Sequence, residues 1–184
     1  MKKKLILKSL VGLITISNAA LAGSIEEIKG GISAQSVNFI SPNVEGGVAL
    51  SGEILFKAPD ILSAIWSPKP HLGFSLATTE DSTSFIYSGL TWRQSFFSDR
   101  AFFDFGVGGA VHDGRVSFNA AVDLPRSNGA FLGCPVLFRL HGGPGIRLSK
   151  RWSASLQWEH LSNAGICDEN EGLDNIGFRL GYRF

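Results

Sequence analysis

Apolar and polar residues alternate with a period of two along most of this 184-residue chain. The pattern is clearest in its last twelve residues, LDNIGFRLGYRF. There Ile176, Phe178 and Leu180 occupy even positions, and Arg179 and Arg183 occupy odd positions. Successive side chains of a β-strand point to opposite faces, whereas a helix repeats its apolar residues every three or four positions. The chain is therefore predicted to fold from strands, each with one apolar and one polar face.

Turn-like clusters separate eight such segments. Their predicted ranges are 25–35, 46–58, 69–78, 83–96, 101–112, 134–148, 152–162 and 173–184. A periplasmic β-sandwich or lipocalin-like barrel is the alternative, but it would bury its apolar residues and expose its charges. Here the polar faces carry glycines and charges of both signs, and the chain ends in an aromatic residue. This combination favours an all-β fold, an eight-stranded antiparallel transmembrane β-barrel with apolar faces toward lipid and a filled polar interior.

The first 22 residues have the organisation of a secretory signal peptide. A basic start at Lys2 to Lys4 precedes an apolar stretch that ends in Ala20-Leu21-Ala22. We expect cleavage after Ala22, which leaves residues 23–184 as one β-barrel domain in the outer membrane of a Gram-negative bacterium. The mature chain keeps 13 basic and 16 acidic residues, a formal charge of −3, so it has no basic excess for nucleic acid. No later segment approaches the ~18 to 20 apolar residues of a spanning helix.

Several other features of the sequence do not predict a site. The pentapeptide HGGPG, 141–145, resembles the oxyanion loop of some α/β-hydrolases, but no G-x-S-x-G motif accompanies it, so we interpret it as a bent strand. His71, His112, His141 and His160 are far apart and show no metal-ligand spacing, so neither a metal nor a cofactor is predicted. Interior charges are expected to pair and fill the lumen rather than line a pore. They include Arg93, Asp104, Arg139, Arg147, Glu159, Arg179 and Arg183.

His160 and Ser162 interrupt the apolar face of the seventh predicted strand. They follow the apolar even positions between Trp152 and Trp158, so both side chains are expected on the lipid-facing side, roughly 6.5 to 7 Å apart. By the same alternation Asp174 lies on the outward face of the last strand, at a height similar to His160. An acid, a base and a hydroxyl placed together can activate a nucleophile. The alternative is that these polar residues only mark the membrane interface, where charge costs less than at the midplane.

The stretch EHLSNAGICDENEGLDNIGFRLGYRF, residues 159–184, resembles the C-terminal signature of the outer-membrane lipid A 3-O-deacylases, the PagL-like family of acyloxyacyl hydrolase-type barrels. The shared pattern is H-x-S-N-A from His160, N-x-G from Asn170, an acid two residues later and a terminal aromatic strand. In that family an eight-stranded barrel hydrolyses the ester-linked acyl chain at the 3 position of lipid A with an external Ser-His-Glu triad. The close match covers these residues alone; the rest agrees in length, signal peptide and strand pattern.

The resemblance implies a role for each matching residue. Ser162 would be the nucleophile, His160 the general base and later acid, and Asp174 the orienting acid. Asn163 and the backbone N–H groups up to Gly165 would stabilise the oxyanion.

One departure from the family pattern leaves the acid open. The chain has Asp174 where the family uses Glu, one methylene longer, and Glu171 in the preceding loop is the alternative acid. The side chains expected to contact acyl chains are those of Trp152, Leu156, Trp158, Phe178 and Leu180.

The two cysteines, Cys134 and Cys167, occur in an exported chain, where a disulfide can persist. A disulfide between them is a hypothesis, and it would tie the loop between Ser162 and Asp174 to the neighbouring strand.

Together these observations predict an enzyme, a carboxylic ester hydrolase that needs no cofactor and acts on lipid A or lipopolysaccharide among outer-membrane lipids. Nucleic acid is not an expected partner, and a homodimer is left open. The alternatives are a non-catalytic outer-membrane barrel of the adhesion or membrane-stabilising kind and a palmitoyl-transferring lipid A barrel. The sequence shows no acceptor route for the second of these.

Overall fold

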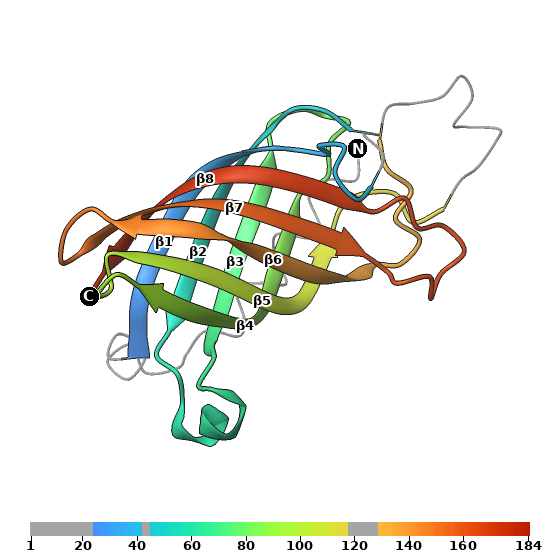
Figure 1. Cartoon of the computed structure of the whole chain (residues 1–184). Coiled ribbons are helices and arrows are strands. Elements are labelled where there is room, and N and C mark those ends of the chain that lie inside the picture. The colour runs from blue at the N-terminus through green and yellow to red at the C-terminus, as the bar shows by residue number, and fades with distance from the viewer. Residues whose placement is uncertain (1–23, 42–44, 118–128) are drawn as a thin grey trace, which may run out of the picture.

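The computed structural model describes residues 24–41, 45–117 and 129–184. Within them eight antiparallel strands pair in chain order, and β8 pairs with β1 to close a barrel (Figure 1). The strands are β1 (Ile25–Ala34), β2 (Val48–Phe56), β3 (Lys69–Ala77), β4 (Phe85–Phe96), β5 (Ala101–His112), β6 (Val136–Arg147), β7 (Trp152–Ser162) and β8 (Leu173–Arg183). The predicted eight-stranded barrel is confirmed, and the predicted strand ends differ from the observed ones by no more than two residues. The predicted signal peptide lies outside the described residues.

The two ends of the barrel differ in their connections. At the end where β1 begins and β8 ends, the connections are 57–68, 97–100 and 148–151. At the opposite end they are 35–47, 78–84, 113–135 and 163–172. The 57–68 connection contains the 3-10 helix η3 (Asp60–Ile65). Short turns at one end and longer loops at the other are typical of outer-membrane barrels.

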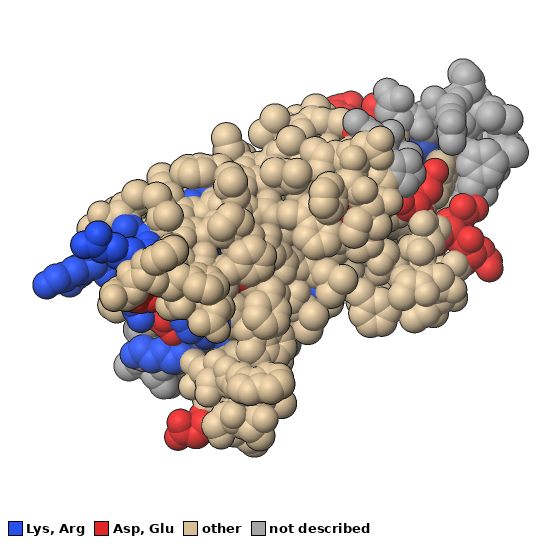
Figure 2. Space-filling model, viewed as in Figure 1, with Lys and Arg blue, Asp and Glu red and all other residues tan. Residues whose placement is uncertain are grey.

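The outer wall of the barrel is an apolar belt. Alternate residues of the strands point outward and are 40% to 59% exposed; Ile32, Leu50, Val107, Phe138 and Phe178 are examples. Figure 2 shows charged residues gathered toward the two ends, with a largely uncharged wall between them. No helix in the described ranges is long and apolar enough to cross a membrane. So much exposed apolar surface is uncommon on a soluble monomer.

The lumen is filled by paired charges. Arg139 is fully buried and binds Glu159 through Nε at 2.8 Å and Nη2 at 2.7 Å, while its guanidinium lies 3.7 Å from the centre of the Tyr87 ring. Arg179 donates to Glu53 at 3.1 Å and to the Tyr87 hydroxyl at 3.0 Å. Such pairs satisfy the groups that the polar faces bring inside, so the lumen is packed rather than open.

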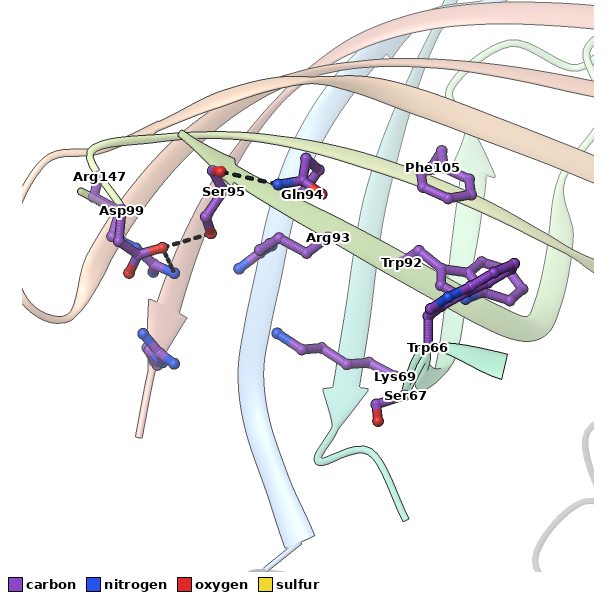
Figure 3. Close-up of a pocket in the computed structure, with 11 residues that line it drawn as sticks. Trp66, Ser67, Lys69, Trp92, Arg93, Gln94, Ser95, Asp99, Phe105 and Arg147 are labelled. Atoms are coloured by element: carbon purple, nitrogen blue, oxygen red, sulfur yellow. Dashed lines mark hydrogen bonds and ion pairs between the residues drawn. The ribbon is translucent and has the colours of Figure 1, made fainter. Parts of the chain in front are cut away.

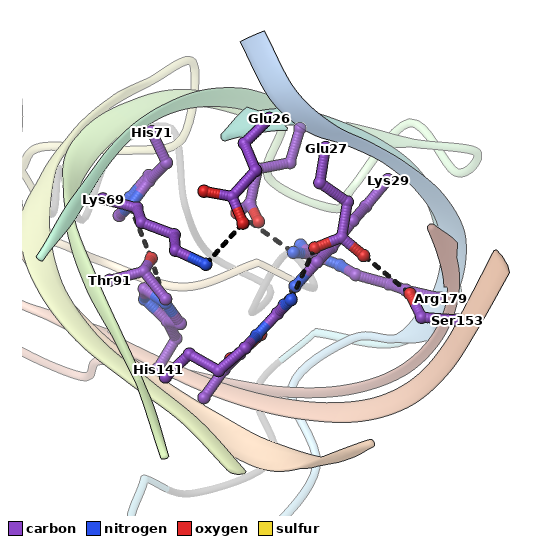
Figure 4. Close-up of polar contacts among 12 residues, drawn as sticks. Glu26, Glu27, Lys29, Lys69, His71, Thr91, His141, Ser153 and Arg179 are labelled. Atoms are coloured by element: carbon purple, nitrogen blue, oxygen red, sulfur yellow. Dashed lines mark hydrogen bonds and ion pairs between the residues drawn. The ribbon is translucent and has the colours of Figure 1, made fainter. Parts of the chain in front are cut away.

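A second interior cluster lies nearer the short-turn end. Lys29 and Arg93 both bind Asp104 at 2.7 Å, and Arg93 also binds Glu27 at 2.8 Å. Figure 4 shows Glu27 and Lys29 in the lumen, with the Ser153 hydroxyl donating to Glu27.

The HGGPG segment belongs to this packed interior. It lies within β6, and His141 is buried beside Thr91 and Arg139. A Cβ atom at Gly106 would collide with the His141 ring, and one at Gly145 would collide with the Phe102 ring. These glycines make room for bulky interior side chains in a narrow barrel. The segment is thus structural, as the absence of a nucleophile elbow indicated.

The loop end of the lumen is closed by apolar packing. Ala130 and Leu132, from the connection between β5 and β6, are buried against Phe85, Leu137 and Leu161. Below this cluster, the cavity beside Gln157, Glu159 and Arg179 measures about 10 Å³, space for about one water molecule. In the described residues, paired charges and apolar side chains thus fill the lumen, as expected for the interior charges.

The buried Arg139–Glu159 pair gives a stability prediction. Arg139→Leu leaves the Glu159 carboxylate without its main partner in the lumen, and the free energy of unfolding should fall by about 3 to 5 kcal/mol. Adding Glu159→Leu should recover part of that loss because no uncompensated charge remains. Urea unfolding in detergent micelles, followed by tryptophan fluorescence, measures both. A double variant no more stable than Arg139→Leu would contradict this account of the lumen.

Candidate active site

The outward face of β7 ends in His160 and Ser162. Along β7 the even-numbered residues are partly or fully exposed and the odd-numbered ones are buried, so both side chains lie on the lipid-facing wall as predicted. The predicted acyl-contact residues occupy the same wall, where Trp152, Leu156 and Phe178 are 45% to 55% exposed. Ser162 pairs across to the exposed Phe138 on β6.

Asp174 lies directly opposite His160 in the β7–β8 ladder. Directly opposed residues of antiparallel strands have Cβ atoms about 4.5 to 5.5 Å apart, so the short aspartate side chain can reach the imidazole. His160 Nδ1 lies 3.1 Å from Asp174 Oδ1. Cross-strand register therefore compensates for the methylene that Asp lacks relative to Glu.

The Asp174 carboxylate is fully buried although it lies on the outward face, because residues 35–41 fold over it. The N–H groups of Ile40 and Ser41 both donate to Oδ2, the first at 2.8 Å. The Val37 N–H donates to the Asp174 carbonyl at 2.7 Å and holds this segment in place. The carboxylate is thus shielded from lipid and water and held in one orientation.

Trp158 provides a further donor to the same carboxylate. Its Nε1–H donates to Asp174 Oδ1 at 2.9 Å, the oxygen that also faces His160. The Trp158 ring lies 5.7 Å from the Phe39 ring and is stacked beside His160, with centroids 6.2 Å apart. Trp158 therefore has a positioning contact that its predicted role as an acyl contact did not include.

These contacts assign the proton of the imidazole. An ionised carboxylate only accepts hydrogen bonds, so the proton between His160 and Asp174 is placed on Nδ1. The lone pair is then on Nε2, on the far side of the ring from Asp174, where a general base needs it. The Ser162 hydroxyl makes no hydrogen bond within the described part of the chain. The structure therefore brings the acid and the base together, and it leaves the hydroxyl on the same face but not bonded to the base.

The predicted oxyanion donors are already engaged in the loop that follows β7. The Asn163 side chain donates to the carbonyls of Leu132 and Glu169, and its oxygen accepts from the Gly165 N–H at 2.8 Å. The Asn163 N–H donates to the Asn170 side chain at 3.0 Å. In this structure neither Asn163 nor Gly165 has a donor left for a substrate, because both are used to shape the loop.

The alternative acid, Glu171, faces another part of the molecule. Its carboxylate accepts from the Phe131 N–H at 2.8 Å, and its own N–H donates to the Phe131 carbonyl at 3.1 Å. It has no contact with His160 in the described residues. Glu171 thus joins the 163–172 loop to the 113–135 connection.

A disulfide makes a second link between these two loops. Cys134 and Cys167 are bonded, with Cα atoms 5.8 Å apart. His112 and Cys134 are also joined, through the imidazole Nε2 and the Cys134 carbonyl, at 2.7 Å. The 163–172 loop, which connects Ser162 to Asp174, is therefore attached to the loop that covers the end of the barrel. The described residues contain no group of three or more His, Cys, Asp or Glu side chains that could hold a metal ion.

Comparison with solved structures places this barrel among membrane proteins. The crystal structure of the outer membrane enzyme PagL superposes with a TM-score of 0.64 at 15% identity, covering 86% of this chain and 99% of that one. Neisserial surface protein A gives a TM-score of 0.53 at 7% identity, covering 88% and 97%. A designed transmembrane β-barrel gives 0.51 at 8% identity, covering 86% and 96%. At these identities the similarity concerns the fold.

Comparison with protein families extends the resemblance of the C-terminal residues to most of the chain. No curated protein matches the sequence. Residues 46–183 match the family described as lipid A 3-O-deacylase (PagL). With its closed barrel, the protein is placed in the outer membrane. From the usual asymmetry of such barrels we expect the short turns in the periplasm and the longer loops outside. This chain belongs to the PagL family of outer-membrane lipid A 3-O-deacylases.

Proposed function

We propose that this protein is a serine esterase that removes the ester-linked acyl chain at the 3 position of lipid A. The observation that carries the proposal is the His160–Asp174 hydrogen bond on the lipid-facing wall, two residues from the Ser162 hydroxyl. A lipid in the outer leaflet could reach this site laterally without entering the lumen. The family match supports the choice of lipid A as substrate.

The proposed reaction begins with attack by Ser162 Oγ on the ester carbonyl while His160 Nε2 takes the hydroxyl proton. The tetrahedral intermediate collapses, the bond to the sugar oxygen breaks, and His160 returns the proton to that oxygen. This leaves an acyl ester on Ser162 and a free 3-hydroxyl on lipid A. Water, deprotonated by His160, then hydrolyses the acyl ester and releases the fatty acid.

The oxyanion that forms in both steps needs a donor beside Ser162. Within the described residues the Ala164 N–H has no hydrogen-bond partner, whereas those of Asn163 and Gly165 are engaged. Ala164 and Gly165 adopt left-handed backbone conformations, with φ of 56° and 76°, so the chain turns sharply after the nucleophile. We assign the oxyanion donor to the Ala164 N–H and a loop-shaping role to Asn163.

Removing the nucleophile tests the proposal directly. Ser162→Ala should lower the rate of deacylation by on the order of 10³-fold or more, because no acyl ester can form. Mass spectrometry of lipid A from cells making each variant should show loss of one 3-hydroxyacyl group with the wild type only. Ser155→Ala is the matched control, since Ser155 lies on the same strand but faces the lumen. Unmodified lipid A with the wild type would instead favour a non-catalytic barrel.

The identity of the acid is tested by comparing two carboxylates. Asp174→Asn has nearly the same size but can no longer accept from all four donors, so it should reduce kcat by about 10² to 10⁴-fold. Glu171→Gln should leave kcat within about twofold, since Glu171 only bridges two loops. Heat-dependent mobility on gels checks that both barrels are folded. An equal loss in both variants would contradict the assignment to Asp174.

Trp158 is predicted to act through Asp174 rather than through packing alone. Trp158→Phe keeps an aromatic ring beside Phe39 but removes the N–H that holds Oδ1. Losing one hydrogen bond to a charged group should lower kcat by about tenfold, with KM within about twofold. Steady-state kinetics on purified protein in micelles separates the two constants. A changed KM with an unchanged kcat would show that Trp158 only contacts the acyl chain.

A further inference from the structure

The barrel wall has a gap at its periplasmic end, between β3 and β4. β3 begins at Lys69, opposite Thr91, whereas β4 continues to Phe96 and pairs there, within the described residues, only with β5. The chain that enters β3 leaves the wall through η3 and two left-handed residues, Trp66 and Ser67, with φ of 64° and 49°. We call the opening between this turn and the end of β4 the periplasmic notch. It holds a cavity of about 450 Å³.

One side of the periplasmic notch is aromatic and continues the lipid-facing wall. Trp66, Trp92 and Phe105 line it (Figure 3). The Trp92 ring stacks on Phe105 with centroids 5.4 Å apart, and Trp92 Nε1 donates to the Ile65 carbonyl at 2.8 Å, which holds the η3 turn against the barrel. Trp66 is 87% exposed and Ile61 is 85% exposed. Exposed aromatic side chains at this height are typical of the membrane interface.

The other side is basic and opens toward the lumen. Four of the eleven lining residues are cations and only Asp99 is an acid. Lys69 and Arg183 share one carboxylate, that of Glu26, at 2.7 Å and 3.5 Å, and Arg147 binds Asp99 at 2.7 Å. These three cations thus pair with two carboxylates, so the side chains at this side of the cavity carry a net charge of +1.

The fourth cation, Arg93, forms its ion pairs inside the lumen. Arg93 lines the cavity but binds Glu27 and Asp104 in the lumen, at 2.8 Å and 2.7 Å. Lys69 and Arg183 are therefore the cations best placed to bind an incoming anion, because within the described residues both pair with one carboxylate, that of Glu26.

We propose that the periplasmic notch binds one anionic phospholipid of the periplasmic leaflet. The phosphate would lie against Lys69 and Arg183, since both side chains suit a phosphate oxygen. The acyl chains would run along Trp66, Trp92 and Phe105 into the apolar belt. A cavity of this size is within the range of small-ligand sites, about 300 to 1,000 Å³. The periplasmic notch lies at the opposite end of the barrel from Ser162. Lipid binding there therefore does not depend on the proposed esterase activity.

Fluorescence quenching by brominated lipids tests this site. Phosphatidylglycerol or phosphatidylcholine with identical brominated chains is titrated into the full-length protein in micelles. Phosphatidylglycerol should quench at lower concentration, and the difference should shrink in Trp66→Phe, which removes the reporter. Lys69→Gln with Arg183→Gln should weaken phosphatidylglycerol binding by about fivefold for each cation removed.

The matched control removes two cations from the same end of the barrel. Lys150→Gln with Arg151→Gln, in the β6–β7 turn outside the cavity, should leave phosphatidylglycerol binding unchanged. Equal quenching by both lipids, or equal weakening in both double variants, would overturn the proposal. Inorganic phosphate that displaces the lipid at a concentration equal to that of the lipid would also overturn it, because the acyl chains would then add nothing to binding. Deacylation by the Lys69/Arg183 variant should stay at the wild-type rate, which separates this result from any failure of the esterase proposal.

Discussion

Closure of the backbone hydrogen-bond ladder is the constraint on which the rest of this structure depends. In lipid no water can satisfy a free N–H or C=O group, so a spanning sheet must close on itself. Here β8 pairs with β1, and the strands turn largely apolar residues outward and bury most of their polar ones. The narrow lumen that results must be filled, and buried pairs such as Arg139 with Glu159 fill it. A polar site for a lipid substrate can therefore form only on the outer wall near a strand end.

The outer wall is an unfavourable place for an ionised carboxylate, and the surroundings of Asp174 offset that cost. Two backbone N–H groups from 35–41, the Trp158 indole and the His160 imidazole all donate to it. These hydrogen bonds satisfy the acceptor oxygens of a carboxylate that is shielded from lipid. The hydrogen bond between Asp174 and His160 also sets the imidazole tautomer, as the proposed role of His160 as general base requires. The loops joined by the Cys134–Cys167 disulfide hold this arrangement at the barrel mouth.

The two ends of the barrel have different chemistry. Basic residues gather at the periplasmic end and acidic residues at the external end (Figure 2). The shortness of β3 leaves an amphipathic opening at the basic end, while apolar packing of Leu132 and its neighbours closes the lumen at the other. A lipid held in the periplasmic notch would lie at the opposite end of the barrel from the proposed hydrolytic site.

The sequence alone predicts the positions of the strands and the side of each strand that faces lipid. It also predicts that His160 lies near an acid on β8. These predictions depend on a period of two, which is a local property, and on antiparallel neighbours that follow each other in sequence. The shell around Asp174 could not be predicted in this way, because the Ile40 and Ser41 amides come from a loop more than 130 positions away. No local pattern indicated that Asn163 would use its side-chain donors on the carbonyls of Leu132 and Glu169. Those features follow from which segments meet when the barrel closes, and only the folded chain decides that.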